Sequence, residues 1–129
     1  MTKFMVQNLK EVKSMNVDAE IGTDIIEISR LRKKPLESNR SFYESIFSHL
    51  EIEHCKKFSD PYTHLAGLFA AKEAIIKSFN KPITMKQIEI SWNASGKPIV
   101  NISNRQINNI KISISHSNLF AIAVACGFF

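Results

Sequence analysis

Cysteine is scarce in this sequence. Its 129 residues contain only Cys55 and Cys126, and neither belongs to a Cys-x-x-Cys pair or to a Cys/His pattern typical of metal ligands. Disulfide frameworks and structural zinc sites both require such clustered ligands. The sequence therefore predicts neither, and two ordinary thiols in a reducing compartment are the simpler interpretation.

The start of the chain also lacks a long apolar run. The first apolar stretch, within Lys3–Val6, is short and is soon followed by charged residues. A signal peptide needs an apolar core of at least about 7 residues, and a membrane-spanning helix needs about 20. We therefore expect no membrane association and a cytoplasmic location. Internal repeats and low-complexity tracts are absent as well.

What remains is the composition of an ordinary globular domain, with 44% hydrophobic and 22% charged residues. This length suits one hydrophobic core better than two. The formal net charge of +5 favours an acidic partner, which leaves nucleic acid, a phosphorylated small molecule or an acidic protein surface open. Charge alone does not choose among them.

Residues 1–18 are predicted to be an N-terminal extension of uncertain structure, and residues 19–129 to form a single domain. Ala19–Leu31 has the pattern of a strand that runs into a turn or a short helix. Arg32–Arg40 is predicted to be a basic loop. A short helix is predicted after it, with Ser41 and Glu44 as its capping box. Its apolar stripe would consist of Phe42, Ile46 and Leu50.

The strongest helical pattern begins at Asp60, a good N-cap, with Pro61 at the first helical position, and runs to about Phe79. Another short helix is predicted before it, over 51–58. After Pro82 the pattern changes to strands, predicted over 87–92, 97–102, 109–115 and 119–126. The last strand is apolar on both faces, as a central strand would be. The sequence predicts an α+β fold in which helices cover one face of an antiparallel sheet.

Two carboxylates lie in apolar surroundings. Glu73 and Lys77 are four residues apart on the long helix, where a solvated ion pair is the simpler interpretation. Asp24 follows Gly22, where it is typical of a turn. If the fold brought the two acids together they would repel each other, unless a divalent cation joined them. Magnesium is commonly bound by one or two carboxylates completed by phosphate oxygens and water.

Two further segments are ambiguous by themselves. His116, beside Ser115, is predicted at a strand end, where a histidine is usually exposed or locally hydrogen-bonded, and a phosphate ligand is the alternative. Gly96 and Lys97 fit a hairpin turn with a solvated lysine.

Taken in this order, the segments resemble the holo-acyl-carrier-protein synthase family of phosphopantetheinyl transferases. Ile21–Ile25 resembles the first family motif, with Arg30 at the position of its arginine. Phe69–Ala74, followed by Lys77, resembles the second motif and is the most specific match. Weaker matches are Ile88–Ile90, Gly96–Pro98 and Ser113–Ser117. With them, the similarity covers about residues 19–127.

The resemblance implies a phosphopantetheinyl transferase-like fold with one long central helix. It also implies that 4′-phosphopantetheine moves from coenzyme A to a serine of an apo acyl carrier protein, as in fatty acid biosynthesis, with 3′,5′-ADP released. Asp24 and Glu73 would hold Mg²⁺ and, with Lys77, form the catalytic group. The serine proton would go to Glu73 or to a metal-bound water. The coenzyme A-binding residues would be Lys72, Lys77, Lys97, Ser115 and His116.

The resemblance further implies a homotrimer whose active sites lie between subunits, with the two acids from one chain and His116 from the next. Carrier proteins are acidic around their modified serine. A docking surface is therefore predicted at Arg30, Arg32 and Lys33, and added salt should weaken the association. Leu68 departs from the family pattern, because many bacterial members have a basic residue there.

Two rival functions remain. A basic module that binds RNA or DNA would explain the net charge, but the aromatic residues fall mainly on helical apolar faces rather than on the strands. A coenzyme A-binding protein without transferase activity is the second rival. The presence of Asp24, Glu73 and Lys77 argues against it.

Overall fold

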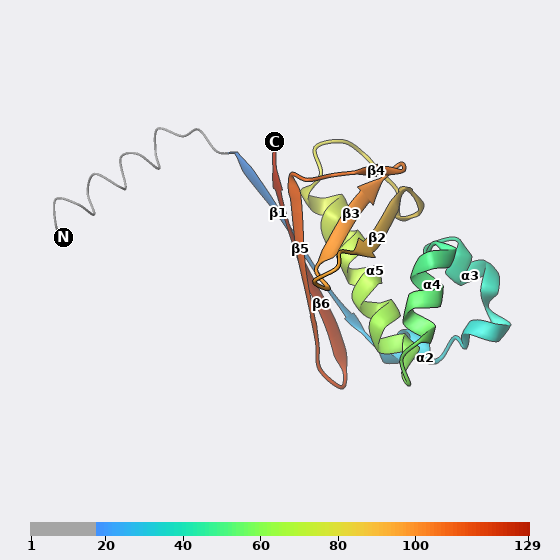
Figure 1. Ribbon diagram of the computed structural model, residues 1–129. Helices are drawn as coiled ribbons and strands as arrows, with labels where there is room; N and C mark the ends of the chain where they lie inside the picture. Colours follow the sequence, from blue (N-terminus) through green and yellow to red (C-terminus); the bar gives the residue numbers. More distant parts are fainter. Residues whose placement is uncertain (1–17) are drawn as a thin grey trace, which may run out of the picture.

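The computed structural model describes residues 18–129, so that all of the predicted extension except Asp18 lies outside the described residues. Figure 1 shows the long helix α5 in the middle of the molecule, with a sheet along one side and the shorter helices on another. The helices are α2 (Ser29–Arg32), α3 (Arg40–Glu44), α4 (His49–Lys56) and α5 (Pro61–Ser78), with 3-10 turns at Leu36–Ser38 and Met85–Gln87. The strands are β1 (Ala19–Glu27), β2 (Ile88–Trp92), β3 (Pro98–Ile102), β4 (Arg105–Gln106), β5 (Ile110–His116) and β6 (Phe120–Phe128).

The strands form two sheets, which corrects the prediction of a single one. Their orders are β1-β6-β5 and β2-β3-β4, and all neighbours are antiparallel. Ser103 and Asn104, both with positive φ, turn the chain back on itself after β3. The short β4 then pairs with β3, so this hairpin closes its own sheet. The prediction of an α+β fold with antiparallel pairing is confirmed.

Helix α5 begins where the sequence predicts. The Asp60 carboxylate accepts a hydrogen bond from the Tyr62 backbone N–H, and Pro61 occupies the first turn. Leu68, Ala71 and Ile75, at spacings of three and four along the helix, are buried in the core. Helix α5 packs this buried face on the β1-β6-β5 sheet. The rest of the core is arranged around it.

The capping box was predicted for the wrong helix. Helix α3 has Asn39 as its N-cap, without a side-chain hydrogen bond, and it ends at Glu44. The capping box belongs instead to α4, where Ser48 and Glu51 bond reciprocally. The predicted stripe is also wrong at Leu50, which is exposed. The pairs Ser41/Glu44 and Ser48/Glu51 have the same spacing in the sequence. Only the tertiary contacts of Glu51 distinguish the second pair from the first.

Strand β6 is central in its sheet, as its two apolar faces predict. One face carries the buried Ala121, Ala123 and Ala125, which pack under α5. The opposite face carries exposed apolar side chains, which on β6 and β1 are Phe120, Ile122, Val124, Phe128, Ile21 and Ile25. Within residues 18–129 nothing covers this surface, which we call the outer sheet face.

No helix in the described part of the chain is long and apolar enough to cross a membrane.

Candidate functional site between β1 and α5

A close approach of β1 to α5 creates the candidate site. A Cβ atom placed on Gly22 would lie 2.0 Å from the backbone oxygen of Ala74 and 3.0 Å from Cβ of Lys77. Only glycine allows this contact, because any side chain would push the strand away from the helix. The first predicted motif therefore contains glycine for a packing reason, and that packing brings Asp24 to α5.

We expect Gly22→Ala to move β1 away from α5 and to destabilise the fold by about 1–3 kcal/mol, the usual cost of overpacking. Transferase activity should fall with it, since Asp24 moves as well. Thr23→Ala, at the exposed neighbouring position, is the matched control and should change stability by less than about 1 kcal/mol. Urea denaturation measures both variants, and equal midpoints would contradict the packing explanation.

Asp24 lies next to Lys77. Its carboxylate oxygen is 3.6 Å from the Lys77 Nζ, which also donates a 2.8 Å hydrogen bond to the Thr23 backbone oxygen. The Asp24 side chain is 19% exposed and that of Lys77 is 53% exposed. Lys77 thus keeps a positive charge beside Asp24 at a place that a ligand can reach.

Glu73 lies one helical turn before Lys77 and on the same side of α5. Strand β1 and helix α5 run in opposite directions (Figure 1), so the step from Gly22 to Asp24 leads along the helix toward Glu73. The Glu73 carboxylate is half-buried, and it makes no hydrogen bond or ion pair with the residues that the structure describes. Asp24 and Glu73 therefore lie on facing elements, each with oxygen atoms open to a ligand.

This donor set fits magnesium. Both groups are hard carboxylate oxygens, and Mg²⁺ usually takes one or two of these together with phosphate oxygens and water. Residues 18–129 contain no cluster of three or more His, Cys, Asp or Glu side chains that would hold a metal by themselves. A cation held by Asp24 and Glu73 would consequently need ligand or water oxygens as well.

Lys72 does not belong to the site, which corrects its predicted role in binding coenzyme A. Its side chain is 0% exposed, and its Nζ lies 2.6 Å from an oxygen of Glu51, which is equally buried. The Nζ also donates to the backbone oxygen of Ile46 at 2.7 Å. The second Glu51 oxygen accepts from the Ile90 backbone N–H at 2.8 Å. This pair joins α4, α5 and β2, and no phosphate can reach it.

Glu51 was not among the predicted residues. The only sequence signal for it was the Ser48–Glu51 capping spacing, which fixes one carboxylate oxygen but gives no hint of Lys72.

His116 lies in a different pocket, of about 400 Å³, on the side of α5 that faces α4 and β2. The pocket contains Gly96 but not the neighbouring Lys97, whose predicted nucleotide contact stays a prediction. Ser115 does not share the pocket, because successive side chains of a strand point to opposite faces of the sheet. The structure thus separates Ser115 from His116, although the sequence prediction paired them. Leu68 also lines this pocket and gives it no charge.

The two acids and the His116 pocket face opposite sides of α5. Glu73 follows the pocket residue His64 by nine residues, about two and a half helical turns. At this spacing the two side chains point in opposite directions from the helix axis. One ligand molecule that contacts both the carboxylates and His116 would have to pass around the helix, or else draw the two halves of its site from different chains.

Of the three predicted docking residues, Arg30 and Lys33 are exposed and lie at the C-terminal end of β1, beyond Asp24. Arg32 is paired within the chain. Its guanidinium lies 2.5 Å from the Asp60 carboxylate, and this hydrogen bond is the largest cause that lowers the Asp60 pKa. Arg32 therefore supports the N-terminus of α5, and its charge is already compensated.

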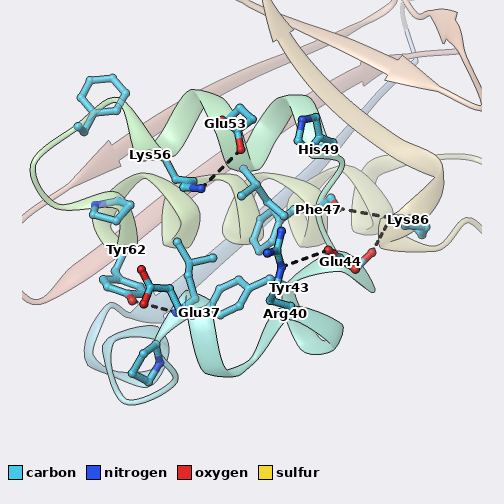
Figure 2. Close-up of a pocket in the computed structure, with 15 residues that line it drawn as sticks. Glu37, Arg40, Tyr43, Glu44, Phe47, His49, Glu53, Lys56, Tyr62 and Lys86 are labelled. Atoms are coloured by element: carbon cyan, nitrogen blue, oxygen red, sulfur yellow. Dashed lines mark hydrogen bonds and ion pairs between the residues drawn. The ribbon is translucent and has the colours of Figure 1, made fainter.

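A larger cavity, of about 660 Å³, lies between α3, α4 and the start of α5. Figure 2 shows its apolar floor, which includes Tyr43 and Phe47, and a rim of both charge signs. Arg40 pairs with Glu44 on this rim, and Lys86 donates to the backbone oxygens of Glu44 and Phe47. It contains no predicted site residue.

Comparison with known proteins identifies the family. The model of the 4′-phosphopantetheinyl transferase superfamily matches residues 20–125. This chain belongs to that superfamily. The holo-[acyl-carrier-protein] synthase of Clostridium botulinum (strain Eklund 17B / Type B) is 43% identical over 115 residues, which cover 81% of this chain and 93% of the relative. The enzyme of the same name from Chlorobaculum parvum is 40% identical over 111 residues, covering 82% of this chain and 95% of the relative.

Solved structures agree. A holo-(acyl-carrier-protein) synthase from Bacillus anthracis, in complex with CoA (3′,5′-ADP), superposes with a TM-score of 0.70 at 33% identity, covering 84% of this chain and 95% of the other. The Helicobacter pylori synthase in complex with coenzyme A gives a TM-score of 0.69 at 31% identity, covering 84% of this chain and 99% of the other. The predicted family, the phosphopantetheinyl transferase fold and the enzyme class, holo-[acyl-carrier-protein] synthase, are confirmed.

Proposed function

We propose that this chain transfers the 4′-phosphopantetheine group of coenzyme A to a serine of an apo acyl carrier protein, with help from Mg²⁺, and releases 3′,5′-ADP. The observation that carries this proposal is the placement of Asp24 and Glu73 on facing elements, beside Lys77, in a chain of this superfamily. The rival protein that binds coenzyme A without transferring it would not need both acids.

The residues divide the chemistry among them. Asp24 and Glu73 would hold Mg²⁺, which supplies charge neutralisation at the diphosphate of coenzyme A. Glu73 accepts the proton of the carrier serine as its oxygen attacks the phosphorus attached to pantetheine. The bond from that phosphorus to the 3′,5′-ADP oxygen breaks, and 3′,5′-ADP leaves with the electron pair. Lys77 stabilises the negative charge of the phosphates during this step.

Coenzyme A extends from the two acids of one subunit to His116 and Lys97 of the next, in a homotrimer. The support for this arrangement is that Glu73 and the His116 pocket face opposite sides of α5 within one chain. The outer sheet face, with exposed Ile122 and Val124, offers an apolar surface that a subunit contact would bury.

Val124→Glu tests the subunit contact. We expect it to convert the trimer to monomers and to remove most transferase activity, because a charge on a buried apolar interface is costly. Leu50→Glu, at an apolar residue of α4 that is 67% exposed and lies off the sheet, is the matched control and should stay trimeric. Sedimentation velocity gives the mass of each variant. A Val124→Glu protein of unchanged mass would contradict the proposed interface.

A second test concerns the division of the site between chains. Neither Glu73→Gln nor His116→Ala subunits should be active alone, but mixed trimers should regain some active sites. Activity that stays at the level of the separate variants after complete subunit exchange would place each site within one chain.

Arg30 and Lys33 are proposed to contact the acidic carrier, and the KM for the carrier should rise with salt concentration. A cytoplasmic location and a role in fatty acid biosynthesis stay predictions.

The function itself is tested with coenzyme A, Mg²⁺ and a panel of apo acyl carrier proteins from fatty acid, polyketide and peptide synthesis. The mass of at least one carrier should increase by one phosphopantetheine group. Binding of coenzyme A with no change in any carrier mass would favour the rival protein without transferase activity.

A further inference from the structure

A row of aromatic rings lines the His116 pocket. His54 stacks on Trp92 with ring centroids 3.7 Å apart, and Phe58 stacks on His64 at 3.6 Å. The two stacks meet where His54 and Phe58 lie 5.5 Å apart, and His64 continues the row to His116 at 5.9 Å. These residues come from β2, α4, the segment after it, α5 and β5. Stacking orients the His54 and His64 rings before any ligand arrives, and His116 meets His64 edge-on.

The imidazole nitrogens are free for a ligand. None of them makes a hydrogen bond or ion pair with another residue in the range 18–129, and none is a buried atom without a partner. His54 and His64 are half-buried and His116 is exposed. The ring nitrogens are therefore accessible from solvent, and a ligand that enters the pocket can bond to them.

Imidazoles are also the only titratable source of positive charge on the pocket wall. Among the described residues no lysine or arginine lines it. Burial lowers the pKa of His54, and the charge of Lys57 lowers it further. Burial likewise lowers the pKa of His64, followed by the charges of His116 and His54, whereas Asp60 raises it. Without a ligand, protonation of His64 is therefore opposed by burial and by the two neighbouring histidines.

We infer that His54 and His64 join His116 in binding the phosphate groups at the nucleotide end of coenzyme A, and that this binding is linked to proton uptake. The inference rests on the proposed function, which supplies coenzyme A as the ligand. A phosphate among the three rings attracts the protonated forms, and an imidazolium donates from both ring nitrogens where the neutral ring donates from one. Burial disfavours a charged imidazole in the free pocket. Once the anion is bound, the same burial strengthens the attraction between imidazolium and phosphate.

The sign of the pH effect follows. In the free protein the pKa values of His54 and His64 are lowered, and a bound phosphate would raise them. Affinity is therefore greatest below the free-state pKa values, falls as pH rises from these toward the bound-state values, and is constant above them. The other charges that act on these two rings are that of Lys57 on His54 and that of Asp60 on His64.

The experiment measures kcat and the KM for coenzyme A from about pH 5.5 to about pH 8.5, the range in which histidine titrates. We expect the wild-type KM to rise about tenfold, the effect of one unit of pKa shift. His64→Gln and His54→Gln should each have a higher KM than wild type at about pH 6 and nearly the same KM at about pH 8, with kcat little changed.

His49→Gln is the matched control, because His49 is exposed and lines the other cavity, and it should follow the wild type at every pH. The phosphates of coenzyme A also titrate, with a second pKa near about 6. That titration is common to all variants, so the ratio of variant to wild-type KM isolates the histidines.

A second measurement needs no turnover. Calorimetry with 3′,5′-ADP in two buffers of different ionisation enthalpy counts the protons taken up on binding. Wild type should take up protons near about pH 7, and His64→Gln should take up fewer. Equal proton uptake and parallel KM profiles in wild type and both histidine variants would overturn the inference while leaving the transferase function intact. Proton-linked binding without any carrier modification would instead support the histidine site and refute the proposed transfer.

Discussion

Glu73→Gln is expected to reduce phosphopantetheine transfer at least about a hundredfold while the protein stays folded. Glutamine keeps the shape of the side chain, but it removes the charge that would hold Mg²⁺ and the group proposed to accept the serine proton. Because Glu73 makes no ion pair or hydrogen bond with the described residues, its replacement leaves no partner unsatisfied. Carrier mass measured against time gives the rate, and urea denaturation verifies the fold.

Glu27→Gln, at an exposed position of β1, is the control for loss of one acid near the site, and it should retain wild-type turnover. If Glu73→Gln turned over at a rate close to wild type, Glu73 would be neither metal ligand nor base, and the simpler interpretation of a solvated Glu73–Lys77 pair would hold.

Lys72→Ala should cause the largest loss of stability, about 3–5 kcal/mol. Removal of the lysine leaves the Glu51 carboxylate buried at 0% exposure without its cation. The free energy of unfolding measured with urea gives the size of the effect. Lys56→Ala, which breaks the exposed pair with Glu53, is the matched control and should cost less than about 1 kcal/mol.

The double variant Lys72→Met/Glu51→Leu distinguishes a buried charge from a lost contact. It removes both charges at similar volume, so we expect it to be more stable than Lys72→Ala. If Lys72→Ala unfolded at the same urea concentration as Lys56→Ala, the pair would not be a structural connection between α4 and α5. The prediction that Lys72 binds coenzyme A would then be open again.

Local sequence signals predicted the elements well where the signal is complete within a few residues. Asp60 and Pro61 mark the start of α5, and the two apolar faces of β6 place it at the centre of its sheet. The hairpin that ends the second sheet was not predictable in this way, because its turn needs two consecutive residues with positive φ, and Ser103, unlike Asn104, has no preference for that conformation.

The candidate site was likewise predictable in part. The resemblance selected Asp24, Glu73 and Lys77, and the structure places them on facing elements. It also selected Lys72, whose role depends on Glu51, a partner 21 residues away that periodicity cannot reveal. The histidine row escaped prediction for the same reason. His54, His64 and His116 lie on separate elements, and only packing brings their rings together.

The proposed site requires that Asp24 and Glu73 bind one divalent ion together, which can be measured directly. Mn²⁺ can replace Mg²⁺ as a paramagnetic probe, and electron paramagnetic resonance in the presence of coenzyme A counts the bound ions. We predict one Mn²⁺ per wild-type chain, and a large loss of affinity in both Asp24→Asn and Glu73→Gln. Unchanged Mn²⁺ binding in either variant would contradict a metal site shared by β1 and α5.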